Sequence, residues 1–260
     1  MSESSSRIAG INRLALFLGC FGLALILSQP VQAQALDIDQ PEITKGEREV
    51  RSVNVVNGGF PTGSGGMSRT SHELSTSYSP TGWMKLGAHF DIENVIDEGW
   101  RLDHGAIELQ FELLTAEASG GIALGWTTNV QISTDDASTN SLIFGPIVKF
   151  SSKAASLTLN PYFEDTFGRN DSPGLAALYG WQGRLEAREG LAIGIEGYGK
   201  IDDIADPPPV NEQDHRVGPA VYLWTEVAPQ RTASLDAALL FGLTEAAPGT
   251  SFKFNFGMTF

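Results

Sequence analysis

The 260-residue sequence has very few cysteines and is poor in basic residues. Its one cysteine, Cys20, lies near the N-terminus, so the rest of the chain can form neither a disulfide framework nor a thiolate site. Seventeen Lys and Arg face 31 Asp and Glu, which gives a formal net charge of −14. Because binding to nucleic acid phosphates needs clustered Lys and Arg, this balance excludes a nucleic-acid partner.

Long apolar runs are also scarce. The one candidate, Leu14–Leu27, is too short for a spanning helix, which needs about 20 apolar residues. Arg7 and Arg13 precede it and Val31-Gln32-Ala33 follows, the pattern of a secretory signal peptide (residues 1–33) cleaved after Ala33. Cleavage would remove two basic residues and one acidic residue, leaving 15 basic and 30 acidic residues and a formal charge of −15.

Catalytic and metal-binding motifs are missing at the sequence level. None of the four histidines has a serine two positions further on, which is the spacing at which a histidine on the same strand face would activate a serine. No His, Asp and Glu set has metal-ligand spacing, and the glycines of residues 63–66 lack the following lysine and helix of a phosphate loop. We therefore expect no enzymatic activity, no cofactor and no metal site.

The last ten residues show the clearest pattern. Apolar residues alternate with polar or small ones from Phe252 to Phe260, so a strand there has one strongly apolar face. This stretch resembles the closing strand of bacterial outer-membrane β-barrels, of the small transporter or porin-like type. The resemblance implies that Phe256, Met258 and Phe260 form a signal for the barrel-assembly machinery.

Similar alternation recurs along the chain and predicts twelve strands. A chain without a helical span can cross a bilayer only as a closed barrel, because every backbone polar group in hydrocarbon needs a partner. The fold class is therefore all-β, a closed antiparallel up-and-down transmembrane barrel of about 12 strands formed by residues 50–260. The predicted strands are Val50–Asn57, His72–Ser79, Trp83–Ile92, Gly105–Leu114, Ile122–Ser133, Leu142–Ser151, Leu157–Phe167, Ala176–Ala187, Leu191–Lys200, His215–Val227, Ala233–Leu243 and Ser251–Phe260.

The segments between these strands alternate in length. Five links are short turns, whereas the others, such as residues 58–71, 93–104 and 201–214, are longer, as expected for the two ends of an outer-membrane barrel. Pro146, Pro161 and Pro219 fall inside predicted strands, so each should mark a bulge, a kink or a wrong boundary. Such kinks can also open a gap in the wall through which an apolar solute leaves sideways.

Residues 34–49 are polar and acidic without a sustained period. We interpret them as a periplasmic N-terminal tail. The alternative is a plug that folds into the mouth of the barrel, and the residues alone do not decide between the two.

Aromatic residues should form two girdles at the membrane interfaces. Near the predicted strand ends, the candidates are Trp83, Tyr162, Tyr179, Trp181, Tyr198, Tyr222 and Trp224.

The inner face of the barrel must carry the chemistry. Its polar residues either pair into a hydrogen-bonded filling or line a conducting lumen, and Glu108 and Glu112 would then be successive steps on a path. The candidate pore-lining residues are Lys85, His89, Asp91, Glu108, Gln110, Glu112, Glu164, Arg184, Glu186, Glu196, Lys200, Arg216 and Lys253.

These patterns favour a passive or facilitated channel for small solutes in the outer membrane of a Gram-negative bacterium. Its partners would be outer-membrane lipid, the assembly machinery and a small solute. Two alternatives remain: an accessory or structural barrel for envelope assembly or polysaccharide export, and a secreted soluble all-β binding protein.

Overall fold

A computed structural model describes residues 36–59, 68–95, 99–117, 120–134, 139–168, 171 and 174–260. The predicted signal peptide, residues 1–33, lies outside the described residues. Within these ranges no helix is both long and apolar enough to cross a membrane. One short 3-10 helix, η1 (Val210–Glu212), lies between two strands.

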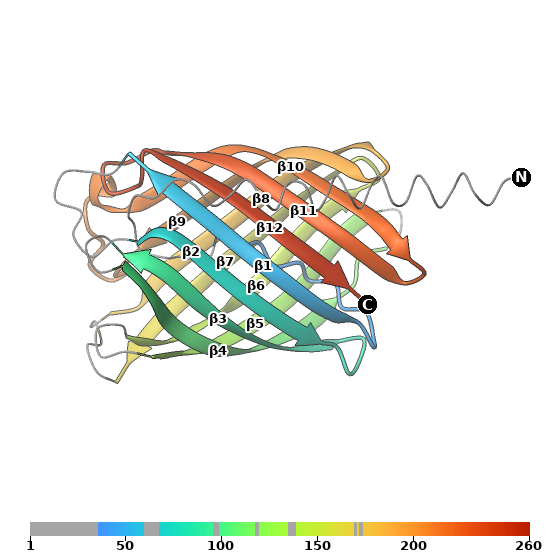
Figure 1. The fold of residues 1–260 in the computed structure, drawn as a ribbon, viewed down its shortest axis with the longest axis horizontal. Helices are drawn as coiled ribbons and strands as arrows, with labels where there is room; N and C mark the ends of the chain where they lie inside the picture. Colours follow the sequence, from blue (N-terminus) through green and yellow to red (C-terminus); the bar gives the residue numbers. More distant parts are fainter. Residues whose placement is uncertain are drawn as a thin grey trace, which may run out of the picture.

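The described chain forms one closed antiparallel barrel of twelve strands (Figure 1). Each strand pairs with its neighbours in sequence, and the first strand pairs with the last. The strands are β1 (Arg48–Gly58), β2 (Ser68–Tyr78), β3 (Met84–Val95), β4 (Gly99–Leu114), β5 (Gly120–Ser133), β6 (Asn140–Ser152), β7 (Ala155–Phe167), β8 (Ala176–Arg188), β9 (Leu191–Ile201), β10 (Asp214–Ala228), β11 (Arg231–Gly242) and β12 (Thr250–Thr259). The predicted fold class and all twelve predicted strands are confirmed.

The closing strand has the alternation that the sequence predicts. In β12, Ser251, Lys253 and Asn255 are buried on the inner side, whereas Phe252 is exposed on the outer side. The pairing of β12 with β1 runs from Glu49 opposite Thr259 to Gly58 opposite Thr250, so the seam is paired along almost the whole of both strands.

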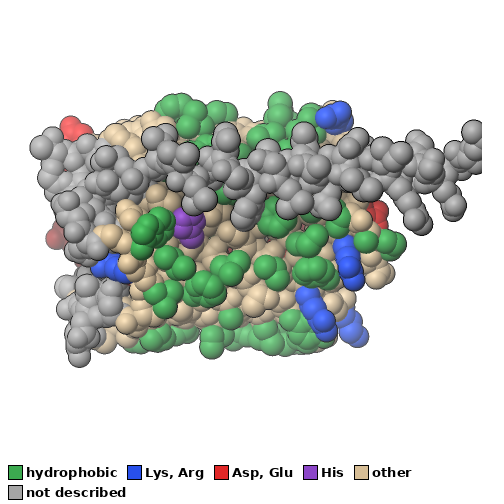
Figure 2. Space-filling model, viewed as in Figure 1, with side chains coloured by type: hydrophobic (Ala, Val, Ile, Leu, Met, Phe, Trp, Pro, Cys, Tyr) green, Lys and Arg blue, Asp and Glu red, His purple; other side chains and the backbone are tan. Residues whose placement is uncertain are grey.

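The outer wall of the barrel is apolar. Figure 2 shows hydrophobic side chains distributed over the wall, with Lys and Arg side chains near the ends. Ile107, halfway along β4, is 67% exposed, and large apolar residues of the other strands are exposed in the same way. An apolar outer band with a polar interior is the arrangement of a barrel whose wall faces lipid.

The two ends of the barrel carry different connections. At the end with the C-terminus, the links are short, for example residues 79–83, 153–154, 189–190 and 229–230; at the other end they include residues 202–213 and 243–249 (Figure 1). This asymmetry confirms the predicted topology.

One predicted loop is wrong. Residues 93–104 belong mostly to strands, because β3 continues to Val95 and β4 begins at Gly99. Glu93 lies opposite Arg101 in the pairing and forms an ion pair with it at 2.6 Å. Cross-strand contacts of this kind stabilise a strand pair whose charged sequence lacks the apolar alternation of the wall.

The three prolines lie within strands and interrupt the pairing on one side of each. Between β6 and β7, the pairing stops after Phe144–Phe163 and resumes at Val148–Leu159, and the constant register places Pro146 opposite Pro161 within that gap. Around Pro219, the pairing of β10 with β11 is missing in the same way, without a change of register. Each proline therefore marks a local opening in the hydrogen-bond ladder, because proline has no N–H to donate.

Candidate functional site: the barrel lumen

Residues 36–47 are hereafter the inner segment: residues 36–43 run inside the barrel, and residues 44–46 form an exposed turn at its end. Leu36, Ile38 and Ile43 are buried inside the barrel, although they precede the first strand. This placement corresponds to the plug and not to the loose periplasmic tail, and β1 itself begins at Arg48, two residues earlier than predicted. The physical reason is that every second or third residue of this polar stretch is apolar and buried, while its polar groups find partners on the wall.

The apolar anchor of the inner segment is a small cluster within the lumen. Leu36 and Ile38 are 0% and 3% exposed. They belong to a buried cluster with wall residues Val55, Ala192, Tyr198, Ala220, Tyr222, Ala238 and Leu240. Gly180 on β8 makes room for this packing, because a Cβ atom at that position would lie 2.6 Å from the Cδ1 atom of Ile38.

Hydrogen bonds to wall side chains hold the middle of the inner segment. The backbone N–H of Asp39 donates to Asn160 Oδ1 at 2.8 Å, and Asn160 Nδ2 donates to the Asp39 carbonyl at 3.2 Å. Tyr162 donates its hydroxyl proton to the Asp39 carboxylate at 2.6 Å. From β4, Gln110 Nε2 donates to the Gln40 carbonyl at 2.6 Å. These bonds satisfy backbone groups that would otherwise be buried without partners.

Ion pairs hold both ends of the segment. Asp37 pairs with Arg51 of β1 at 2.6 Å, and Glu42 pairs with Lys149 of β6 at 2.7 Å. Near the second pair, the backbone N–H of Ile43 donates to Glu112 Oε2 at 2.7 Å. The inner segment is therefore attached to several parts of the wall by noncovalent contacts alone.

Asp39 is the ionisable group at the centre of this attachment. It belongs to the inner segment, outside the membrane-spanning strands, and burial raises its pKa to about 6. The negative charge of Glu108 raises the pKa further, whereas Lys85 and the hydrogen bond from Tyr162 lower it. The lumen therefore favours the protonated, neutral form of Asp39 more than water does.

A buried ionic network inside the lumen joins β9 to β12. Glu196 of β9 and Lys253 of β12 form an ion pair at 2.7 Å, with both side chains almost fully buried. Tyr198 and Tyr222 donate hydroxyl protons to the Glu196 carboxylate at 2.7 and 3.0 Å, and Gln182 donates from its amide at 3.2 Å. Glu196 is thus fully hydrogen-bonded, which makes its burial tolerable.

The structure places every predicted pore-lining residue on the inward row of its strand, alternating with the exposed apolar row. Several of them pair with each other or with neighbours and do not point freely into an open path. Lys200 pairs with Glu164 at 2.7 Å, and Arg184 lies over the Tyr222 ring at 4.4 Å. The remaining contacts are Arg216 with Asp214, Arg184 with Glu186, Glu108 with Thr127, and His89 with Asp91.

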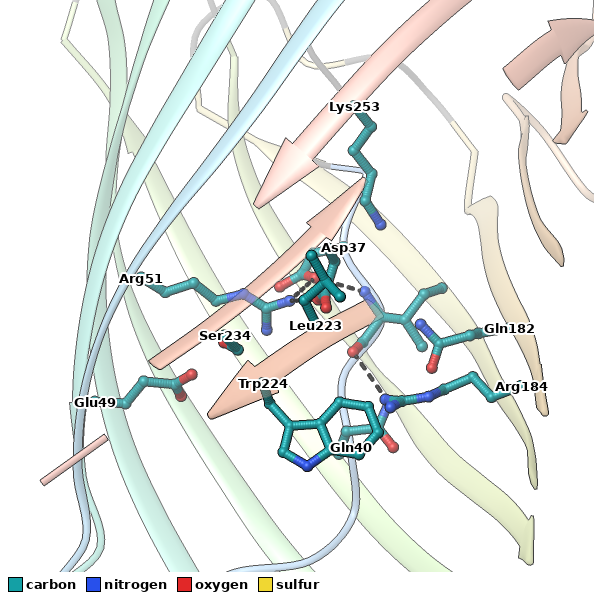
Figure 3. Close-up of a pocket in the computed structure, with 12 residues that line it drawn as sticks. Asp37, Gln40, Glu49, Arg51, Gln182, Arg184, Leu223, Trp224, Ser234 and Lys253 are labelled. Carbon is teal, nitrogen blue, oxygen red and sulfur yellow. Dashed lines mark hydrogen bonds and ion pairs between the residues drawn. The ribbon is translucent and has the colours of Figure 1, made fainter. Parts of the chain in front are cut away.

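Beside the inner segment lies a cavity of about 190 Å³ (Figure 3). Side chains of both charge signs surround it, and the dashed contact between Asp37 and Arg51 crosses one side. Its lining includes Glu49, Arg51, Gln182, Arg184, Trp224, Asp236 and Lys253 from the wall, with Asp37, Ile38 and Gln40 from the inner segment. The cavity is large enough for a few water molecules or a small polar solute.

The sequence did not reveal the wall positions that bind the inner segment. Tyr162 was assigned to a girdle, and no signal in the sequence indicated that the inner segment would reach it or Asn160. Four girdle candidates are wrong: Tyr198 and Tyr222 are 2% and 1% exposed inside the lumen, Tyr162 contacts Asp39, and Trp224 lines the luminal cavity. All four positions lie on the inward row of their strands, so counting alternate positions from the apolar neighbours would have identified them.

Comparisons with known proteins agree with the fold. No family model matches the chain, and no curated protein matches its sequence. Among solved structures, the COG4313 outer membrane channel from Pseudomonas putida F1 matches with a TM-score of 0.60 and 10% identity, covering 86% of this chain and 98% of that one. The NanC porin matches with a TM-score of 0.52 and 10% identity, covering 82% of this chain and 98% of that one.

The chain therefore has the closed twelve-stranded fold of outer-membrane porin-type barrels. At this identity the likeness concerns the fold alone. What the lumen does must be argued from the side chains described above.

Proposed function

We propose that the chain is an outer-membrane channel for small solutes and that the inner segment restricts its lumen. The observation that supports this most directly is the set of polar and ionic contacts between residues 36–47 and wall side chains. A structural barrel needs no such occupant, since wall residues can fill a narrow lumen by pairing with one another.

The contacts of the inner segment suit a reversible closure. Apart from the apolar anchor at Leu36 and Ile38, they are hydrogen bonds and ion pairs, and each neutral hydrogen bond has a modest net free energy of roughly 0.5–1.5 kcal/mol. Breaking these few contacts would let the segment move away. A lumen lined by both charge signs would then become accessible.

The location and partners follow from the same proposal. We infer cleavage after Ala33, insertion into the outer membrane of a Gram-negative bacterium, and recognition of Phe256, Met258 and Phe260 by the barrel-assembly machinery. The exposure of Phe260, at 45%, is compatible with such recognition. The reaction class is passage of a solute, without catalysis.

A second candidate is lateral passage of an apolar solute through the wall. The specific observation is the unpaired stretch between β6 and β7, where Pro146 and Pro161 face each other on the outer side. Passage there would break no ladder hydrogen bonds, but β6 and β7 would have to separate, because a Cβ atom at Gly145 would already lie 2.6 Å from the Pro161 carbonyl oxygen.

Single-channel conductance in a planar bilayer tests the first candidate. The mature chain, residues 34–260, should conduct weakly, whereas deletion of residues 36–44 should increase the conductance severalfold. Gly180→Leu should act in the same direction, because a side chain there would occupy the position of Ile38.

Gly183→Leu on the same strand is the matched control. A Cβ at Gly183 meets Ile195 at an ordinary 3.6 Å, away from the inner segment. Its conductance should equal that of the mature chain. Equal conductance of the deletion variant and the mature chain, both folded, would exclude the inner segment as the restriction.

A further inference from the structure

Three ligand-type side chains meet on the wall of the lumen, nearer to the end with the longer loops. His89 and Asp91 are two residues apart on the inward row of β3, and His104 of β4 lies directly opposite Asp91 in the pairing. Asp91 Oδ2 lies 3.0 Å from His104 Nε2 and 3.6 Å from His89 Nε2. All three ligand atoms lie within 4.8 Å of one another.

One oxygen of the buried Asp91 carboxylate lacks the hydrogen bond that such an atom needs. Asp91 is only 5% exposed. Its Oδ2 atom, which points between the two imidazoles, makes no hydrogen bond within the described residues. A buried carboxylate oxygen is costly unless a hydrogen bond, a cation or a metal ion compensates its charge.

A β-bulge brings a further carboxylate behind the cluster. The register of β3 with β4 shifts between Asp91 and Ile92, which leaves Asp103 as the extra residue beside His104. Asp103 Oδ2 lies 2.8 Å from His104 Nδ1. A carboxylate that holds one imidazole nitrogen fixes the ring and leaves the other nitrogen to bind a metal, the usual arrangement around metal-bound histidines.

We propose that His89, Asp91 and His104 form a binding site for a divalent transition-metal ion of the Zn²⁺ type. Two imidazole nitrogens and one carboxylate oxygen suit zinc, copper or nickel better than calcium or magnesium, which prefer oxygen ligands. A fourth ligand could be water or Glu73, which lies opposite Asp91 on the other neighbouring strand. The bound ion would link β3 to β4 inside the lumen.

The test uses the mature chain, residues 34–260, folded in detergent and without an affinity tag. Titration calorimetry with Zn²⁺ should show one site per chain. The electron paramagnetic resonance spectrum of the Cu²⁺ form should show coupling to two nitrogen atoms.

Variants assign the ligands. His89→Gln and His104→Gln should each remove one nitrogen coupling and weaken Zn²⁺ binding by more than tenfold. Asp103→Asn should keep both couplings and weaken binding by about 10- to 100-fold, as loss of an outer partner does. The matched control is His72→Gln, since His72 bonds to Asn54 on a different part of the wall.

Three results would overturn the site: no Zn²⁺ binding to the folded barrel, nitrogen couplings that persist in both ligand variants, or equal weakening by His72→Gln. The shift in gel mobility between heated and unheated samples shows that each variant is folded. A folded barrel that binds no metal would mean that the three side chains form only a hydrogen-bonded and ionic part of the wall. None of these outcomes depends on conductance, so they are separate from the test of the channel.

Discussion

At the scale of single residues, the lumen is held together by charges that have lost contact with water. Glu196 and Lys253 are 0% and 1% exposed and depend on each other and on two tyrosine hydroxyls. Bringing two ions out of water has a large cost, so the pair contributes little net stability but strongly penalises the loss of one partner.

Lys253→Met should therefore lower the free energy of unfolding by about 3–5 kcal/mol, because it leaves a buried carboxylate without its cation. Lys200→Met is the matched control. Lys200 pairs with Glu164 at the same 2.7 Å distance, but its side chain is 27% exposed, so the loss should be closer to about 1 kcal/mol. Urea unfolding in lipid vesicles, followed by gel mobility, measures both, and equal losses would contradict this account.

Residue parity explains how much of the lumen could be predicted. Alternation assigned Glu196, Lys253 and Gln110 to the inner face correctly, because the wall forces every second side chain inward. The partner of each residue was not predictable, since pairing depends on the register between strands and on rotamers. The cross-strand contact between Asp91 and His104 was not predicted, because His104 belongs to the segment, residues 93–104, that was interpreted as a loop.

At the scale of elements, the strands were easier to predict than the segment before them. Most wall strands repeat an apolar period of two over about ten residues, which is a strong local signal. The inner segment has no such period, and its position depends on Asn160 and Gln110, which lie far along the sequence. Only tertiary contacts decide between a plug and a tail.

The gap between β6 and β7 gives a prediction at this scale. In Pro146→Cys combined with Pro161→Cys, a disulfide should form across the gap, since the two positions face each other on the outer side and the mature chain has no other cysteine. If apolar solutes leave by this route, oxidation should lower their uptake into vesicles and leave ion conductance unchanged.

The control for this prediction is Phe144→Cys combined with Phe163→Cys. These two residues form the last regular pair before the gap, so a disulfide there should not alter uptake. Unchanged uptake after complete oxidation of the Pro146 and Pro161 variant would exclude the lateral route.

At the scale of the whole molecule, the apolar outer wall distinguishes a membrane barrel from a secreted soluble one. Ile107 is 67% exposed halfway along β4, and Leu243 is 64% exposed in a loop at the barrel end. In water, the two positions would be equivalent surface sites. In a bilayer, only the first faces hydrocarbon.

Ile107→Arg should thus lower the free energy of unfolding in lipid vesicles by about 2–4 kcal/mol, whereas Leu243→Arg should change it by about 0–1 kcal/mol. Urea titration of both variants against the unmodified barrel measures the difference. Two equally small effects would favour the soluble alternative over the membrane barrel.

The seam between β1 and β12 has a consequence for the order of folding. The two strands pair across almost the entire sequence, so their contacts have the highest loop-closure cost in the molecule and are the slowest to form. The inner segment directly precedes β1 and bonds to Asn255 of β12 through Asp37 at 3.3 Å. The plug is thus enclosed by the same late event that completes the wall, and a chain that closed without it would have to admit it afterwards through one end.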